Sequence, residues 1–244
     1  LNDFLEGLGG LRCRYNFIRH IRAKVHESIR GIVLSPPQLP PMESTDLKLT
    51  PLDAQHEALG AKMVPFAGYR MPVTYAGLTE EHHAVRERYG MFDVSHMGEF
   101  MVEGPEALDL IQWISTNDAS KLVDGQVQYS CMPNGQGGIV DDLLIYRFHA
   151  ESFMLVVNAS NMDKDWDWIQ SQNRFNATLH NRSEQFALIA VQGPQAAAVI
   201  RPHFEGNRAP DELKYYTFTE GLFAGVPTIL SATGYTGAGG FELY

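Results

Sequence analysis

Two adjacent carboxylates, Asp141 and Asp142, interrupt a segment that otherwise has the composition of a buried β-strand. β-Branched and aliphatic residues flank the pair, and a Gly-Gly turn signal precedes it. Because successive side chains of a strand point to opposite faces, the two carboxylates must point in opposite directions. Burying a carboxylate is costly unless it is paired or hydrogen-bonded, so a buried one usually has a function. We predict that Asp142 faces the more enclosed surface, together with Val140, Leu144 and Tyr146.

A second candidate for chemistry is the glycine-rich segment 233–240, which holds four glycines in eight residues. It lacks the G-x-x-x-x-G-K-[ST] pattern and the strand–loop–helix context of G-x-G-x-x-G, so a phosphate-binding loop is disfavoured. A tight turn between two strands is the preferred interpretation, because glycine adopts positive φ there and lets a ligand or backbone approach closely. Tyr235 and Glu242 are the polar groups that such a site could use.

Two single polar residues lie near these segments. Tyr129 is predicted to face the Asp pair across a hairpin, and the alternative is an aromatic residue of a half-buried core. Asn158 ends an apolar strand, where it either caps the next turn or binds a ligand amide. The sequence leaves both alternatives for Asn158 open.

Other polar clusters favour structural roles. Residues 91–97 are typical of a core-lining turn in which Asp93 or Ser95 satisfies backbone groups. The adjacent His82 and His83 point about 100° apart on a helix and cannot both face one ion. Surface or capping roles are therefore expected for these two and for His96, and no metal site is predicted.

Composition limits the class of partner. The net charge is −10 and the pI about 5.3, which disfavours nucleic-acid binding through a basic surface. No segment approaches the ~20 apolar residues of a membrane span, so no membrane association is expected. The two cysteines, Cys13 and Cys131, do not suggest a disulfide framework and fit a reducing compartment.

Residues 1–41 differ in character from residues 42–244. They carry six Lys/Arg and three Asp/Glu, and a Pro-rich stretch at 35–41 breaks regular structure before Met42. We predict a weakly ordered leader that lies upstream of a start at Met42. A mitochondrial presequence is the alternative. The expected location is therefore the cytoplasm, or the mitochondrial matrix if residues 1–41 are a presequence.

Hydrophobic periodicity after residue 43 predicts an α+β fold with mostly antiparallel sheets and packed helices, since helices and strands alternate without a regular βαβ period. The segment 79–89 is predicted to be a helix with Thr79 as its N-cap. The other expected helices are 53–61, 105–115, 161–172 and 195–200, and the expected strands are 99–103, 127–132, 139–148, 153–158, 187–191 and 228–231.

Six short blocks together resemble one enzyme family. They are Pro-Phe-Ala-Gly-Tyr-Arg-Met-Pro at 65–72, Gly-Met-Phe-Asp-Val-Ser-His-Met at 90–97, Gly-Gly-Ile-Val-Asp-Asp at 137–142, Val-Val-Asn-Ala at 156–159, Val-Gln-Gly-Pro at 191–194 and Thr-Gly-Tyr-Thr-Gly at 233–237. In this order they resemble aminomethyltransferase, the T-protein of the glycine cleavage system. The match runs from about residue 50 to residue 243, and residues 1–41 take no part.

The resemblance implies a tetrahydrofolate-dependent enzyme. The family takes an aminomethyl group from the lipoyl arm of H-protein, releases ammonia and forms 5,10-methylenetetrahydrofolate. Asp142 matches the second Asp of the family's G-G-I-[IV]-D-D block and is the implied catalytic residue. Whether it accepts a proton or only orients the folate is left open. The implied folate contacts are Met97, Met101, Tyr129, Asn158, Tyr235 and Glu242.

This chain departs from the family pattern at two places, and other functions are alternatives to the one that the resemblance implies. It usually has an acidic residue where Ala238 stands, and it continues beyond Tyr244 into a β-barrel domain that supplies a substrate-holding arginine. We therefore expect a fragment that is weakly active and prone to aggregate. The alternatives are a folate-binding accessory protein of iron–sulfur or tRNA-modification type, and the folate domain of a sarcosine or dimethylglycine dehydrogenase-like enzyme.

Overall fold

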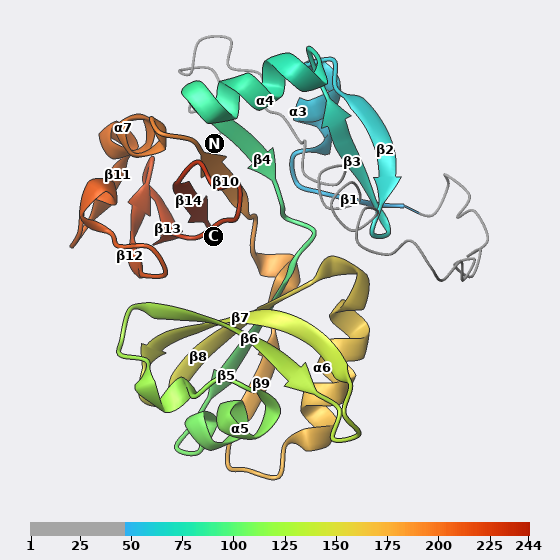
Figure 1. Cartoon of the computed structure of the whole chain (residues 1–244), viewed down its shortest axis with the longest axis vertical. Helices are drawn as coiled ribbons and strands as arrows, with labels where there is room; N and C mark the ends of the chain where they lie inside the picture. The colour runs from blue at the N-terminus through green and yellow to red at the C-terminus, as the bar shows by residue number, and fades with distance from the viewer. Residues whose placement is uncertain (1–46) are drawn as a thin grey trace, which may run out of the picture.

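The computed structural model describes residues 47–244, in which the strands form sheets of three, six and five strands (Figure 1). Neighbouring strands pair antiparallel except β1 (Lys48–Leu49) and β3 (Tyr69–Thr74), which pair parallel. The α+β prediction with mostly antiparallel sheets is therefore confirmed. The predicted leader, 1–41, and its boundary lie outside the described residues. None of the helices in residues 47–244 has the length and apolar character that crossing a bilayer requires.

The three-stranded sheet has the order β1-β3-β2, with β2 at Lys62–Phe66. Ala67 and Gly68 join β2 to β3 and have φ of 50° and 82°. Positive φ at both central residues gives a two-residue hairpin loop whose twist matches its strands. Two helices accompany this sheet, α3 (Asp53–Ala58) and α4 (Leu78–Glu87).

The five-stranded sheet carries the Asp pair and has the order β6-β7-β8-β5-β9. Its first two strands form the predicted hairpin. Helices α5 (Ala107–Ile114) and α6 (Met162–Gln172) pack on one face, where Phe100, Ile111 and Ile169 are fully buried in one apolar cluster. The strands are β5 (Gly98–Glu103), β6 (Gln126–Pro133), β7 (Ile139–His149), β8 (Ser152–Val157) and β9 (Thr178–Asn181).

The six-stranded sheet has the order β11-β12-β13-β14-β10-β4 and packs against the short helix α7 (Ala196–Ile200). Segments far apart in sequence meet here, because β10 pairs with both β4 and β14. Its strands are β4 (Gly90–Asp93), β10 (Ile189–Gln192), β11 (Phe204–Gly206), β12 (Phe218–Phe223), β13 (Val226–Ser231) and β14 (Gly240–Leu243). The 3₁₀ helices are η1 (Ala119–Lys121), η2 (Ala159–Asn161), η3 (Ser183–Gln185), η4 (Arg201–His203) and η5 (Pro210–Glu212).

The second face of the five-stranded sheet meets the six-stranded sheet in an apolar cluster of its own. Tyr146 and Met154 enter it from the five-stranded sheet, and Phe218 and Ile229 enter it from the six-stranded sheet. All four side chains are buried. The junction of the two sheets is thus a packed interior, and it borders the candidate site described below.

Two local predictions were wrong. Thr79 is not the N-cap of α4: Gly77 takes that position, and Glu81 Oε1 accepts the backbone N–H groups of residues 75–77 at 2.8–2.9 Å. Val140 does not share the face of Asp142. The β6–β7 register shifts beside Pro133, and Val140 packs with the helix-covered cluster instead. The bulge breaks the alternation on which that prediction rested.

Candidate functional site

A cavity of about 580 Å³ opens between the two large sheets. A volume in this range suits one small organic ligand. Its walls are mostly apolar, with polar side chains placed among them. The apolar lining includes Phe92, Val94, Leu144, Val156 and Leu188, and the polar lining includes Tyr129, Asp142, Asn158, Gln192, Tyr216, Tyr235, Thr236 and Glu242.

The carboxylate of Asp142 is held in the cavity wall by two donors. Tyr129 Oη donates to Asp142 Oδ2 at 2.6 Å, and Asn158 Nδ2 donates to Oδ1 at 2.9 Å. The hydrogen bond to Asp142 is the main reason, followed by burial, that the pKa of Tyr129 rises to about 12. Tyr129 therefore stays a donor at neutral pH, and the carboxylate keeps one orientation.

Asn158 does not cap the next turn, because its side chain makes no capping hydrogen bond to η2, and since it lines the cavity, its binding of a ligand stays a prediction. Its Nδ2 bridges the two aspartates, reaching Asp141 Oδ1 at 3.2 Å as well as Asp142. Asn161 Nδ2 adds a 2.9 Å bond to Asp141 Oδ2. The two carboxylates point to opposite sides of β7 as predicted, since Asp141 faces α6 and Asp142 faces the cavity.

Asp165 of α6 lies against Asp141 and is fully buried. Among residues 47–244, no donor reaches either of its carboxyl oxygens within hydrogen-bond distance, and Lys164 Nζ forms an ion pair with Oδ1 at 3.7 Å. Burial, with the neighbouring Asp141, raises the pKa of Asp165 to about 8. Asp165 is thus a neutral acid at pH 7 that can donate its proton to Asp141, which leaves Asp141 ionised behind the site.

Glu242 and Tyr235 line another part of the cavity wall. Glu242 sits on β14 with 9% of its surface exposed, and Thr233 Oγ1 donates to its Oε2. Burial raises the pKa of Glu242, although hydrogen bonds from Thr233 and Tyr244 oppose this. Tyr235 projects from the turn between β13 and β14. The glycine-rich segment is therefore the inter-strand turn that its composition predicts.

The structure brings together six of the seven site residues predicted from sequence, since Asp142, Met97, Tyr129, Asn158, Tyr235 and Glu242 all line this cavity. Met101 is the exception. It lies on β5 beside Met154 and packs against the apolar cluster between the sheets, outside the lining.

Sequence reasoning missed Gln192, which is 2% exposed and lines the cavity. Its Nε2 donates to the carbonyls of Thr233 and Phe241 at 3.2 and 3.1 Å, which ties the glycine-rich turn to β10. A polar residue at the end of the apolar strand Ile189–Gln192 was the available signal. The Gly193-Pro194 pair that follows predicts only a turn, not a polar contact to the glycine-rich segment.

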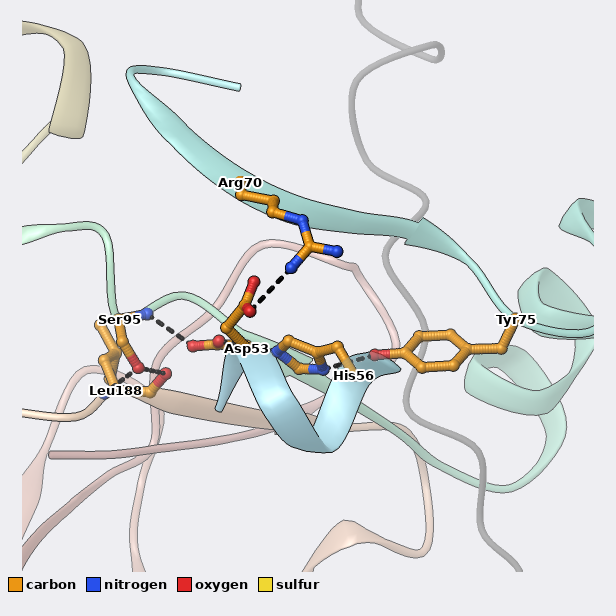
Figure 2. A network of polar contacts seen from close by, with 7 residues as sticks. Asp53, His56, Arg70, Tyr75, Ser95 and Leu188 are labelled. Carbon is orange, nitrogen blue, oxygen red and sulfur yellow. Dashed lines mark hydrogen bonds and ion pairs between the residues drawn. The ribbon is translucent and has the colours of Figure 1, made fainter. Parts of the chain in front are cut away.

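A polar network that the sequence did not predict fixes the segment after β4 (Figure 2). His56 Nε2 donates to Asp93 Oδ2 at 2.9 Å, since a carboxylate oxygen accepts, and His56 Nδ1 forms a 2.8 Å hydrogen bond with Tyr75 Oη. Asp93 Oδ1 accepts the Ser95 N–H at 3.0 Å, and Ser95 Oγ accepts the N–H of Leu188 at 3.0 Å. Asp93 and Ser95 thus satisfy backbone groups as predicted.

This network supports the cavity without lining it: His56 and Asp93 are buried, and neither they nor Tyr75 belong to the cavity lining. Burial raises the pKa of Asp93, but hydrogen bonds from His56 and Ser95 outweigh burial and hold that pKa below its ordinary value. The ionised Asp93 therefore anchors the turn between the cavity-lining residues Val94 and Met97. In the same view, Arg70 of β3 donates to Asp53 of α3 at 2.8 Å.

Comparison with known proteins assigns the family. The model of the GCVT N-terminal domain matches residues 52–244. The chain belongs to this family. It is 54% identical over 199 residues to an aminomethyltransferase of Flavobacterium psychrophilum, covering 81% of this chain and 55% of that protein. An aminomethyltransferase of Porphyromonas gingivalis is 55% identical, with 81% and 54% covered.

A solved structure gives the same assignment for the fold. The glycine cleavage system aminomethyltransferase T from Bartonella henselae superposes with a TM-score of 0.73 at 38% identity, covering 81% of this chain and 53% of that one. The chain thus spans about half the length of the curated relatives it matches. The described GCVT region therefore carries the cavity between the two large sheets and its polar lining.

Proposed function

We propose that this chain carries the folate-binding part of an aminomethyltransferase. The reaction takes the aminomethyl group from the lipoyl arm of H-protein, releases ammonia and forms 5,10-methylenetetrahydrofolate. One observation carries the proposal: Asp142, fixed by Tyr129 and Asn158, lines an apolar cavity that also contains the buried carboxylate of Glu242. Membership of the GCVT family supports it.

The residues present fit tetrahydrofolate. The pyrimidinone ring of its pterin is planar and can pack its faces on apolar side chains, which suits a wall of Phe92, Leu144 and Val156. Its ring edge carries adjacent N–H groups, and Glu242 offers carboxylate oxygens that such donors pair with. Met97 adds a polarisable thioether to the wall, and Met101 packs behind it.

When bound, tetrahydrofolate would supply the amine nitrogens that receive the one-carbon unit. Asp142 stabilises positive charge that develops on nitrogen, either by its field or by accepting a proton. Tyr129 and Asn158 keep the carboxylate oriented before the reaction, so little reorganisation is needed during it. The apolar walls exclude water and strengthen the electrostatic effect of Asp142.

The test is the exchange reaction with H-protein in the purified protein and in Asp142→Asn and Asp142→Ala. We expect turnover to fall by about 100-fold or more, the range measured for loss of one electrostatic stabiliser. Tetrahydrofolate binding, measured by titration calorimetry, should change only a few-fold. Asp167→Ala is the control, because Asp167 is exposed on α6 and outside the cavity.

The outcomes separate the possible functions. Unchanged turnover in both Asp142 variants would remove Asp142 from the mechanism. Tetrahydrofolate binding without any transfer from H-protein, in a version extended to the full length of the relatives, would overturn the transferase and favour a folate-binding accessory role. Absence of folate binding would overturn the proposal as a whole.

A further inference from the structure

The turn that carries Tyr235 lies against the rest of the protein at its two ends. At its start, a Cβ on Gly234 would lie 2.5 Å from the side chain of Gln192, and at its end one on Gly240 would lie 2.5 Å from the Val191 carbonyl. Between them, the N–H of Gly193 donates to the Gly239 carbonyl at 2.8 Å. The base of the turn is thus fixed on β10.

The middle of the turn has less local support. Glycines impose little conformational preference of their own, and Gly237 and Gly239 have φ of 68° and 74°. Tyr235 is 68% exposed although its side chain lines the cavity. Next to Tyr235, Thr236 Oγ1 donates to Gln192 Oε1 at 2.9 Å and accepts the Ala238 N–H at 3.4 Å, and side chains of other elements add to this support.

Two side chains from other elements bind the carbonyls on either side of Tyr235. Arg86, on α4, donates from Nη1 to the Thr236 carbonyl at 2.8 Å across 150 residues of sequence. Tyr215, in the segment before β12, donates from Oη to the Gly234 carbonyl at 2.9 Å. The ring of Tyr215 also packs edge-on against Tyr216, which lines the cavity.

We infer that Arg86 and Tyr215 are positioning residues that hold Tyr235 against the bound folate. This inference rests on the proposed function. Tyr215 holds the Gly234–Tyr235 peptide group and Arg86 holds the Thr236–Gly237 peptide group, so together they restrain the backbone on both sides of Tyr235. Neither residue lines the cavity itself, so each acts through the turn. Because Arg86 belongs to α4, the position of this helix is coupled to the folate site.

The first test needs no ligand. Amide hydrogen exchange across residues 233–240 is compared in the purified protein, Arg86→Gln, Tyr215→Phe and Arg88→Gln. Arg88 is the matched control, because it is an exposed arginine at the C-terminal end of the same helix. We expect faster exchange in the turn for Arg86→Gln and Tyr215→Phe only. Tyr215→Phe removes a single oxygen atom, so it reports on the contact even if Arg86→Gln folds poorly.

The second test measures tetrahydrofolate affinity in the same variants and in the Tyr235→Ala background. Loss of one hydrogen bond to a charged donor predicts roughly tenfold weaker binding for Arg86→Gln, with kcat nearly unchanged at saturating folate. Arg86→Lys should recover part of the affinity. In the Tyr235→Ala background the Arg86→Gln change should have no further effect, because its route to the ligand is gone.

The results distinguish this inference from the proposed function. Unchanged exchange of the turn in both variants would overturn the holding role of Arg86 and Tyr215. If the turn exchanges faster while folate affinity stays unchanged, the two residues do not act through Tyr235. The same conclusion follows if Arg86→Gln weakens folate binding equally in the Tyr235 and Tyr235→Ala backgrounds. An unmodified protein that does not bind folate would overturn the proposed function, while the exchange result would still decide whether the two side chains hold the turn.

Discussion

At the scale of single residues, two carboxylates on the five-stranded sheet have opposite surroundings. Asp142 lines the cavity and accepts hydrogen bonds from Tyr129 and Asn158. Glu99, on β5, is 1% exposed, and its Oε1 has no hydrogen-bond partner within the described part of the chain. Burial raises the pKa of Glu99 to about 8. Asp142 is thus a carboxylate held by two donors, whereas burial favours the neutral form of Glu99.

The state of Glu99 predicts a pH dependence of stability. Its pKa is about 8 in the folded state and 4.5 ordinarily. Between pH 4.5 and pH 8 the folded state therefore binds a proton on Glu99 that the unfolded state has lost. The free energy of unfolding should therefore fall as the pH rises through this window, with a slope approaching ~1.4 kcal/mol per pH unit for this group. Glu99→Gln should remove that slope.

Urea denaturation of the purified protein and of Glu99→Gln at pH 5, 6, 7 and 8 measures this effect. The stability difference should shift in favour of Glu99→Gln as the pH rises. Glu103→Gln is the control, since Glu103 lies on the same strand with its side chain 40% exposed. Parallel pH profiles for the protein and Glu99→Gln would show that Glu99 ionises normally in the folded state.

At the scale of elements, Gly193 joins β10 to α7 where the end of α4 lies against it. Its φ is 131°, and an added Cβ would lie 2.6 Å from the Arg88 carbonyl and 2.8 Å from the Val85 carbonyl. Backbone atoms cannot move aside as a side chain can. Gly193→Ala should therefore destabilise the protein by about 2–4 kcal/mol, through strain and displacement of the helix end.

Gly135→Ala measures the backbone-strain part of that cost, so the difference between the two variants gives the steric part. Gly135 also has positive φ, 74°, but no atom of the residues that the structure describes lies within 4 Å of its added Cβ. The change at Gly135 should cost about 1 kcal/mol from backbone strain alone. Equal midpoints for the two variants in urea denaturation would contradict close packing at Gly193.

Elements were predictable wherever local signals agreed. The β6–β7 hairpin has alternating apolar residues around a glycine-rich loop, and it forms as predicted. Helix α4 also forms, but Glu81 caps it from inside the first turn. The usual N-cap residues are Ser, Thr, Asp and Asn, and this preference pointed wrongly to Thr79. Val140 was misplaced because a bulge is set by the partner strand, which local alternation does not show.

The features that were not predicted depend on contacts between residues far apart in the sequence. The network of His56, Asp93 and Tyr75 joins residues 19 and 37 positions apart, and no spacing rule relates them. Most of the candidate site was predictable through the family resemblance, whose blocks carry Met97, Asp142, Asn158 and Tyr235. Gln192 was missed because its role depends on the turn that packs against it.

At the scale of the whole molecule, the cavity belongs to neither large sheet alone. Asp142 and Asn158 reach it from the five-stranded sheet, and Glu242 and Gln192 reach it from the six-stranded sheet. Its shape therefore depends on how the two sheets pack together. The apolar cluster between them sets that packing, whereas the cluster under α5 and α6 supports the five-stranded sheet alone.

This arrangement predicts different effects for two matched core substitutions. Phe218 is buried between the sheets, with its ring centroid 5.3 Å from that of Tyr146 and 4.9 Å from that of Phe148. Phe153 is buried in the cluster under α5 and α6. Phe218→Leu and Phe153→Leu should each cost about 1–2 kcal/mol of stability. Only Phe218→Leu should also weaken tetrahydrofolate binding, because only it changes the contact between the sheets.

Urea denaturation and folate titration of the two variants measure both effects. Ligand that binds the folded state alone stabilises it by about 2.7 kcal/mol at 100 times Kd. The rise in the denaturation midpoint on adding folate should therefore shrink for Phe218→Leu and persist for Phe153→Leu. Equal rises in two variants of equal stability would mean that the cavity tolerates movement between the sheets, and that its lining residues are positioned within each sheet separately.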